Sequence, residues 1–240
     1  MSGSITPRID TNSMIIYLDA ANLNSYSTTS NWYNLITLNP FTITGDAIYS
    51  SDNFGSLYFD GSNSYAQGTF NISNSTFTIL FWVYFTAYPY SASNYCSSLL
   101  SYGKGNCFGT TYSYQGYTNT FSTCVNINNS VNSIGTVMES NFPTNTWYHY
   151  ATVYDGTKTG NSNRLKLFIN NIERNLKYDA TVPATMYKPN SIVTLSRNIS
   201  GLGFYPNFYG NIALVQIYNR ALTSSEISNN YNSTKFRFGL

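Results

Sequence analysis

Apolar and polar residues alternate with a period of two along much of this chain. In the first clear run Met14, Ile16 and Leu18 share one face, which is typical of a half-buried β-strand. No long helical period precedes Thr223. The pattern predicts an all-β chain, with strand-like runs at Ser13–Asp19, Leu57–Gly61, Thr76–Thr86, Trp147–Tyr154, Arg164–Ile169, Ile192–Ser196 and Ile212–Tyr218.

Two of these runs carry large residues on both faces. Thr76–Thr86 is apolar on both sides, which indicates a strand in the middle of a sheet. In Trp147–Tyr154, one face carries Trp147 and His149, and the other face carries tyrosines. We expect Trp82 and Trp147, which lie on these two strands, to be buried.

The run Arg164–Ile169 predicts a strand with Leu165 and Leu167 turned inward. Asn170 and Asn171 follow it directly. Asparagine tolerates the left-handed backbone conformation of tight hairpins, so we expect a turn at this pair.

One short helix is predicted near the C-terminus, over Thr223–Tyr231. Thr223 and Glu226 stand three residues apart, as the N-cap and N3 positions of a capping box. Leu222 and Ile227 occupy the two positions of a hydrophobic staple around that cap. This helix would attach to the end of the last strand.

No linker rich in proline, glycine or charge divides the 240 residues, a length that suits one large β-sandwich. The segments Ser91–Ser98 and Gly109–Thr123 are polar and rich in tyrosine. We expect them to form long loops or irregular hairpins.

Charged residues make up only 9% of the chain, against about 25% in typical soluble domains. Between Gly61 and Met138 the single charged residue is Lys104. Two interpretations stay open: a biased base composition of the source genome, or a surface that packs into a larger assembly.

The basic residues form no concentrated face, which argues against nucleic acid as a partner. No apolar stretch reaches 18 residues and no secretory signal opens the chain, so we expect no membrane span and synthesis in a cytoplasm.

The odd number of cysteines argues against a disulfide framework. We expect at least two free thiols. A bridge between Cys107 and Cys124 is the alternative if the two lie on adjacent strands.

Several blocks of the sequence together carry a family resemblance. They occur in one order along residues 13–232: Ile16–Tyr26 with Trp32–Leu35, Leu57–Gly61 with Tyr65, Phe77–Ile79 with Phe81–Val83, Asn145–Gly156 with Leu165–Asn171, and Phe208–Ile227. The chain thereby resembles laminin-G-like (LamG), concanavalin A-like jelly-roll domains. Its first block resembles members found in phages and giant viruses.

The resemblance implies an antiparallel β-sandwich jelly roll over residues 13–232, preceded by an N-terminal arm (1–12) and followed by a tail (233–240). It also implies a protein that binds or builds surfaces. We therefore expect a structural or adhesive protein on a virus particle, such as a capsid decoration, fibre head or minor coat protein, made in the host cytoplasm. Its expected partners are other virion proteins or copies of itself, and host-surface glycans. The alternative is a soluble, lectin-like carbohydrate-binding module.

Catalytic chemistry finds little support in the sequence. None of the three glutamates, Glu139, Glu173 and Glu226, has a second carboxylate two residues away, as a glycosidase strand would require. The single histidine, His149, alternates with core residues, and a hydrogen-bonded or half-buried role explains it better than catalysis. We expect a protein that is not an enzyme.

No cofactor is expected either. Where family members bind calcium, they use loop carboxylates, and Asp19, Asp60 and Asp155 match aspartate positions of the family. Each also suits the capping of a turn, and Ala213 and Leu214 stand where relatives often carry acidic residues. A structural calcium ion stays open as an alternative, because calcium needs six to eight oxygen ligands.

A sugar or partner site is predicted in the Tyr-rich loops within Ser91–Thr123. Tyr112, Tyr114 and Tyr117 would supply aromatic platforms, with Gln115 as a hydrogen-bonding amide. In a chain with 23 tyrosines, composition alone also produces such a cluster.

Overall fold

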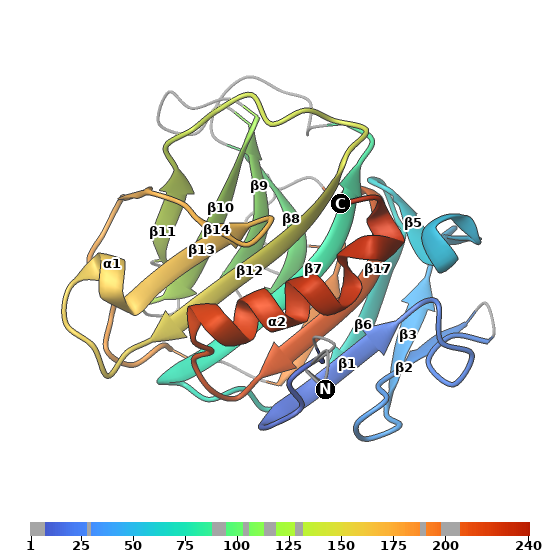
Figure 1. Ribbon diagram of the computed structural model, residues 1–240, viewed down its shortest axis with the longest axis horizontal. Helices are drawn as coiled ribbons and strands as arrows, with labels where there is room; N and C mark the ends of the chain where they lie inside the picture. Colours follow the sequence, from blue (N-terminus) through green and yellow to red (C-terminus); the bar gives the residue numbers. More distant parts are fainter. Residues whose placement is uncertain are drawn as a thin grey trace, which may run out of the picture.

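The computed structural model describes residues 8–27, 30–87, 95–102, 106–112, 119–127, 132–187, 191–197 and 207–240. Two antiparallel sheets pack face to face, and one helix crosses the outer face of the first sheet (Figure 1). The first sheet runs in the order β14 (Ile172–Glu173), β13 (Leu165–Ile169), β12 (Trp147–Asp155), β7 (Thr76–Phe85), β17 (Tyr209–Tyr218), β5 (Ser56–Asp60) and β4 (Ile48–Ser50), with β1 (Met14–Asp19) also pairing with β17.

The second sheet lies against the inner face of the first. Its order is β15 (Leu176–Tyr178), β11 (Asn132–Val137), β10 (Thr120–Asn126), β9 (Asn106–Tyr112), β8 (Tyr95–Tyr102), β16 (Ile192–Leu195), β6 (Tyr65–Thr69), β3 (Pro40–Thr44) and β2 (Asn31–Tyr33). Two short elements lie between strands: a 3₁₀ turn, η1 (Asp52–Phe54), and a four-residue helix, α1 (Asn161–Arg164). The expected all-β sandwich is confirmed.

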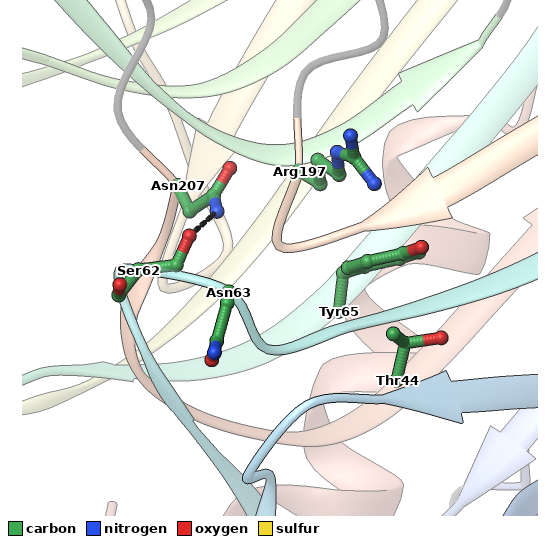
Figure 2. Close-up of a pocket in the computed structure, with 6 residues that line it drawn as sticks. All are labelled: Thr44, Ser62, Asn63, Tyr65, Arg197 and Asn207. Atoms are coloured by element: carbon green, nitrogen blue, oxygen red, sulfur yellow. Dashed lines mark hydrogen bonds between the residues drawn. The ribbon is translucent and has the colours of Figure 1, made fainter.

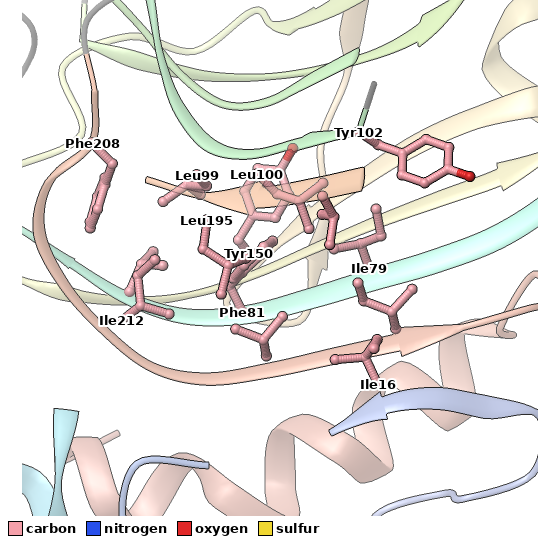
Figure 3. Close-up of a cluster of buried hydrophobic side chains, with 14 of the residues drawn as sticks. Ile16, Ile79, Phe81, Leu99, Leu100, Tyr102, Tyr150, Leu195, Phe208 and Ile212 are labelled. Carbon is pink, nitrogen blue, oxygen red and sulfur yellow. The ribbon is translucent and has the colours of Figure 1, made fainter. Parts of the chain in front are cut away.

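Strand β7 lies in the middle of the first sheet, between β12 and β17, as its two apolar faces predict. Ile79 and Phe81 point into the core between the sheets, where they meet residues such as Leu100 and Leu195 of the second sheet (Figure 3). On the opposite face, Leu80 and Trp82 pack beneath the C-terminal segment. A strand covered on both sides has no solvent-facing positions, which explains its continuous apolar run.

Strand β12 follows the predicted alternation. Tyr148 and Tyr150 enter the core between the sheets, while Ala151 lies under the helix. Trp82 is fully buried, as expected, but Trp147 is only half-buried, so that expectation was wrong for Trp147. Trp147 lies at the start of the strand on the outer face, where the ring of Phe238 covers part of it at 4.6 Å between centroids.

Strand β1 shows why Met14 and Ile16 reach different clusters. The pairing of β1 with β17 shifts register between these two residues. Ile16 and Leu18 therefore belong to the core between the sheets, whereas Met14 packs with the residues under the helix. At the other end of the sheet, Asn170 (φ 50°) and Asn171 (φ 65°) form the predicted turn between β13 and β14.

The C-terminal helix α2 (Ser224–Thr234) begins with the predicted capping box. The Glu226 amide donates to Thr223 Oγ1 (3.3 Å), and the Thr223 amide donates to Glu226 Oε2 (2.7 Å). The staple residues Leu222 and Ile227 are buried together. The helix continues past Tyr231, the predicted end, because Thr234 accepts a hydrogen bond from Trp82 Nε1 (2.8 Å) beneath it.

Residues at both ends of the chain pack on this helix or beside it. The turn η2 (Lys235–Phe238) lies in the segment expected as a C-terminal tail, and it stacks Phe238 on Trp82 at 4.1 Å between ring centroids. Near the other terminus, the Asp10 amide donates to Asn230 Oδ1 (2.8 Å). The described part of the chain holds no helix long and apolar enough to cross a membrane.

Regular pairing extends into the segments expected to be loops or irregular hairpins. Strands β8, β9 and β10 pass through residues 95–98, 109–112 and 120–123, with one register shift between Ser98 and Leu100. The described parts of these segments thus form strands of an irregular hairpin, one of the two expected forms, and not loops, because hydroxyl side chains replace apolar ones on buried positions. Thr123, for example, hydrogen-bonds to Thr152 of the facing sheet (2.7 Å).

Candidate functional site

Three of the four residues of the predicted sugar site, Tyr114, Gln115 and Tyr117, lie outside the described residues. Tyr112 ends strand β9, and its side chain also lies outside the described part. The side chains of Cys96 and Cys107 also lie outside the described part, while Cys124 is buried in β10. The Tyr-rich site therefore stays a prediction, and the alternative of a Cys107–Cys124 bridge finds no support, since Cys124 forms no disulfide bond.

A pocket of about 450 Å³ lies elsewhere, where β3, β6 and β16 of the second sheet meet the turn after β5 (Figure 2). Its volume falls in the range of small-molecule binding sites. We refer to it as the Arg197 pocket, and its lining residues are Thr44, Ser62, Asn63, Tyr65, Arg197 and Asn207.

The turn that joins β5 to β6 fixes one rim of this pocket. Asp60 Oδ1 accepts hydrogen bonds from the amides of Ser62 (3.0 Å) and Ser64 (3.1 Å), and Gly61 adopts a φ of 70°. Burial alone would raise the pKa of Asp60, but these bonds and that from the Ser64 hydroxyl hold the pKa below its ordinary value. The ionised carboxylate thus serves the turn and presents Ser62 and Asn63 at the rim.

Arg197 lies over the ring of Tyr65, with its Cζ atom 4.5 Å from the ring centroid. Tyr65 opens β6, and Arg197 follows β16 after Ser196, whose φ of 66° turns the chain. The Ser196 amide donates to Leu99 O (2.9 Å), which ties this turn to strand β8. A cation over an exposed aromatic ring is held by about 0.5–1 kcal/mol, enough to favour one orientation of the guanidinium.

Asn207 completes the rim from the residues before β17. Its side-chain amide donates to the carbonyl of Ser62, and its own carbonyl accepts from Ser97 Oγ (3.1 Å) (Figure 2). The residues between Arg197 and Asn207 in sequence, 198–206, lie outside the described part.

The lining has a definite chemical character. Among the described residues, it offers three hydroxyls, two amides and one guanidinium, and no carboxylate, imidazole or thiol. Hydroxyls and amides both donate and accept hydrogen bonds, which suits a ligand rich in hydroxyl groups. The described lining lacks an acid–base pair of the kind that bond cleavage requires.

The residues considered for catalysis have structural roles. His149 is buried against Trp82 and Tyr231, and burial lowers the pKa of its imidazole to about 3, so it is neutral at physiological pH. Each glutamate pairs with a cation: Glu139 with Arg174, Glu173 with Lys166, and Glu226 with Arg220.

The three aspartates matched to the family each organise a turn. Asp19 Oδ1 accepts from the Ala21 amide (3.0 Å) and pairs with Arg237 Nη1 (3.0 Å), and Asp155 Oδ1 accepts from the Thr157 amide (3.1 Å). Asp60 does the same in the pocket turn. Within the described residues, no three histidine, cysteine, aspartate or glutamate side chains gather as metal ligands would.

A family model described as the concanavalin A-like lectin/glucanases superfamily matches residues 59–228. The chain belongs to this superfamily. The match covers more than half of the chain and includes five of the six pocket residues, all but Thr44. A comparison with curated proteins finds no significant match.

Solved structures with the same fold include carbohydrate-active and receptor-binding proteins. Domain 4 of AbnA, a GH43 extracellular arabinanase from Geobacillus stearothermophilus solved with arabinotriose, is 17% identical, with a TM-score of 0.59 over 91% of this chain and 98% of that one. Trypanosoma rangeli sialidase is 15% identical, with a TM-score of 0.67 over 99% of this chain and 35% of that one. The botulinum neurotoxin type G receptor-binding domain is 15% identical, with a TM-score of 0.62 over 91% of this chain and 51% of that one. The chain thus spans one whole arabinanase domain but only part of the other two, and these identities establish the fold alone.

Sequence reasoning missed the Arg197 pocket because its residues come from four separate segments. Tyr65 belongs to a block that carries the family resemblance, but nothing in that block marks it as a binding residue. One signal was available: Arg197 directly follows the run Ile192–Ser196, and polar residues at strand ends gather at one edge of a sheet.

Proposed function

We propose that this protein is a non-enzymatic glycan-binding module and that the Arg197 pocket is its binding site. The observation that carries the proposal is the lining itself, in which hydroxyl, amide and guanidinium groups converge beside one aromatic ring. Membership of a superfamily of lectins and glucanases supports it, as does the arabinanase domain solved with arabinotriose.

The non-enzymatic part of the proposal rests on the placement of the carboxylates. No Asp or Glu is among the described residues that line the pocket, and the nearest in sequence, Asp60, is held in its turn by amide hydrogen bonds. A glycosidase needs two carboxylates on either side of the scissile bond. The pocket instead offers groups that bind a sugar without attacking it.

The test is a glycan array followed by calorimetric titration of the best ligand. Tyr65→Ala removes the ring that supports Arg197, and we expect it to abolish measurable binding. Tyr187→Ala is the matched control, because Tyr187 is also a partly exposed tyrosine. It lies at the other end of β7: the amide of its neighbour Met186 donates to the carbonyl of Asn74, just before β7 starts. The pocket instead adjoins the part of β17 that pairs with the end of β7.

Wild-type protein that binds no glycan would refute the proposal. So would a ligand whose affinity is unchanged by Tyr65→Ala. Release of free sugar from a bound oligosaccharide would refute the non-enzymatic part alone.

The location of this function on a virus particle stays a separate proposal. It is supported by the resemblance of the block Ile16–Tyr26 to viral members of the family. Co-purification of the chain with particles from its native source would support it, and recovery only as free protein would refute it.

A further inference from the structure

Arg197 differs from the four arginines that are buried or half-buried, and it shares with the exposed Arg8 the lack of an ion pair among the described residues. Arg174, Arg220 and Arg237 each form an ion pair with a carboxylate, and Arg164 donates to the carbonyls of Lys158 and Val182. Arg197 forms no ion pair, and no described residue accepts a hydrogen bond from its side chain.

The undescribed segments contain no carboxylate side chain that could pair with Arg197. The chain has ten acidic residues, and all of them lie within the described residues. The segment 198–206, which follows Arg197 directly, contains only uncharged side chains. The charge of Arg197 is therefore not neutralised by any carboxylate side chain of the protein.

The strands next to Arg197 offer no competing charge. Strand β16 pairs with β6 and β8, and both belong to the span Gly61–Met138, in which Lys104 is the single charged residue. The acidic residue nearest to the pocket in sequence, Asp60, stays ionised in its own turn and forms no ion pair with Arg197.

The geometry also leaves the hydrogen-bonding edge of the guanidinium available. The Cζ atom of Arg197 lies 4.5 Å from the centroid of the Tyr65 ring, and Figure 2 shows the Arg197 side chain above Tyr65 and to the right of Asn207. A planar guanidinium binds a carboxylate through two parallel hydrogen bonds, which Lys cannot reproduce.

We propose that the Arg197 pocket selects sugars that carry a carboxylate, with Arg197 binding the carboxylate and the amides of Asn63 and Asn207 binding hydroxyl groups of the same sugar. This inference rests on the proposed glycan-binding function and names its ligand class.

The experiment compares each acidic sugar with its own methyl ester, which removes the charge and keeps the ring. The probes are the methyl glycosides of glucuronic acid and N-acetylneuraminic acid, their methyl esters, and methyl galactoside 6-sulfate, titrated by calorimetry. We expect at least one acid to bind about tenfold to a hundredfold more tightly than its ester, since hydrogen bonds to a charged group have that effect.

Variants assign the effect to one residue. Arg197→Gln should reduce the affinity for that acid to the level of its ester and leave the ester unchanged. Arg197→Lys keeps the charge without the planar fork and should give an intermediate affinity. Arg8→Gln removes a charge from an exposed arginine and should change nothing. An unchanged urea unfolding curve shows that each variant folds.

The outcomes separate this inference from the function on which it rests. Equal affinity for acid and ester, with binding still lost in Tyr65→Ala, overturns the inference and keeps the glycan-binding function. Tighter binding of the sulfated sugar than of either acid overturns the assignment to carboxylates. A protein that binds none of the probes and no glycan on the array overturns both proposals.

Discussion

Arg197 and Arg237 show two different uses of the same side chain. Arg237 is 9% exposed, and its Nη1 donates to Asp19 Oδ1 at 3.0 Å beneath the C-terminal turn. Arg197 is exposed and has no carboxylate partner, although every acidic residue of the chain is described. Arg237 therefore stabilises the fold through an internal ion pair, whereas the charge of Arg197 is available to a ligand.

The aromatic residues beside the two arginines differ in the same way. Trp82, near Arg237, is fully buried, stacks on Phe238 and donates to Thr234. Tyr65, beside Arg197, is only half-buried and supports a cation at the edge of the second sheet. The Trp82 N–H is satisfied within the chain and its ring stabilises the fold, whereas the half-buried Tyr65 ring lies at a pocket where it is available for binding.

The largest expected effect concerns Trp82. Trp82→Ala should lower the free energy of unfolding by about 3–5 kcal/mol, because it leaves a cavity under α2 and removes the hydrogen bond to Thr234. Tyr65→Ala should lower it by less than about 1 kcal/mol. Urea denaturation followed by circular dichroism measures both, and equal losses would remove the distinction between the two regions.

The ion pair under the C-terminal turn comes next. Asp19→Asn should cost about 3 kcal/mol of unfolding free energy, because it leaves the buried Arg237 without a counter-charge. Adding Arg237→Met should recover part of that loss, since no charge then stays buried. Asp46→Asn, at an exposed carboxylate, is the control. A cost no greater than that of the control would show that the pair contributes little.

The cap of α2 should have a smaller effect. Thr223→Ala removes the hydroxyl that accepts from the Glu226 amide, and we expect a loss of about 1 kcal/mol. An unchanged melting temperature would show that the capping box does not contribute to stability. Binding at the distant Arg197 pocket should be unaffected.

The smallest effect appears at acid pH. The hydrogen bond from Arg220 lowers the pKa of Glu226 from 4.5 to about 2, against the opposing effect of burial. The folded state thus favours the ionised carboxylate, and the stability it contributes is complete above pH 4.5 and lost as the pH falls toward 2. The stability difference between wild type and Glu226→Gln should therefore shrink across this range. A constant difference would contradict the assigned cause.

The sequence predicted the parts of the fold that depend on local patterns. The two apolar faces of Thr76–Thr86 gave a central strand, the Thr223 and Glu226 pair gave the cap, and Asn170 and Asn171 gave the turn. Each of these signals lies within a few neighbouring residues, where helix and strand periods and turn chemistry act directly.

The second sheet was harder to predict because its buried positions use hydroxyl groups. Thr123 and Ser97 are buried and satisfied by partners from other elements, so their segments have the composition of loops. The Arg197 pocket was missed for a related reason. Its residues converge only after the strand order is fixed, and the lack of a carboxylate partner for Arg197 is a property of the folded chain.

The central claim is that Arg197 serves binding and Arg237 serves the fold. The measurement that tests it most directly is a crossed comparison of Arg197→Gln and Arg237→Gln, each titrated with the acidic sugar that wild type binds and each unfolded in urea. The account predicts that Arg197→Gln loses affinity and keeps its unfolding midpoint, while Arg237→Gln loses stability and, below its unfolding transition, keeps its affinity. Lost stability with unchanged affinity in Arg197→Gln would contradict the account.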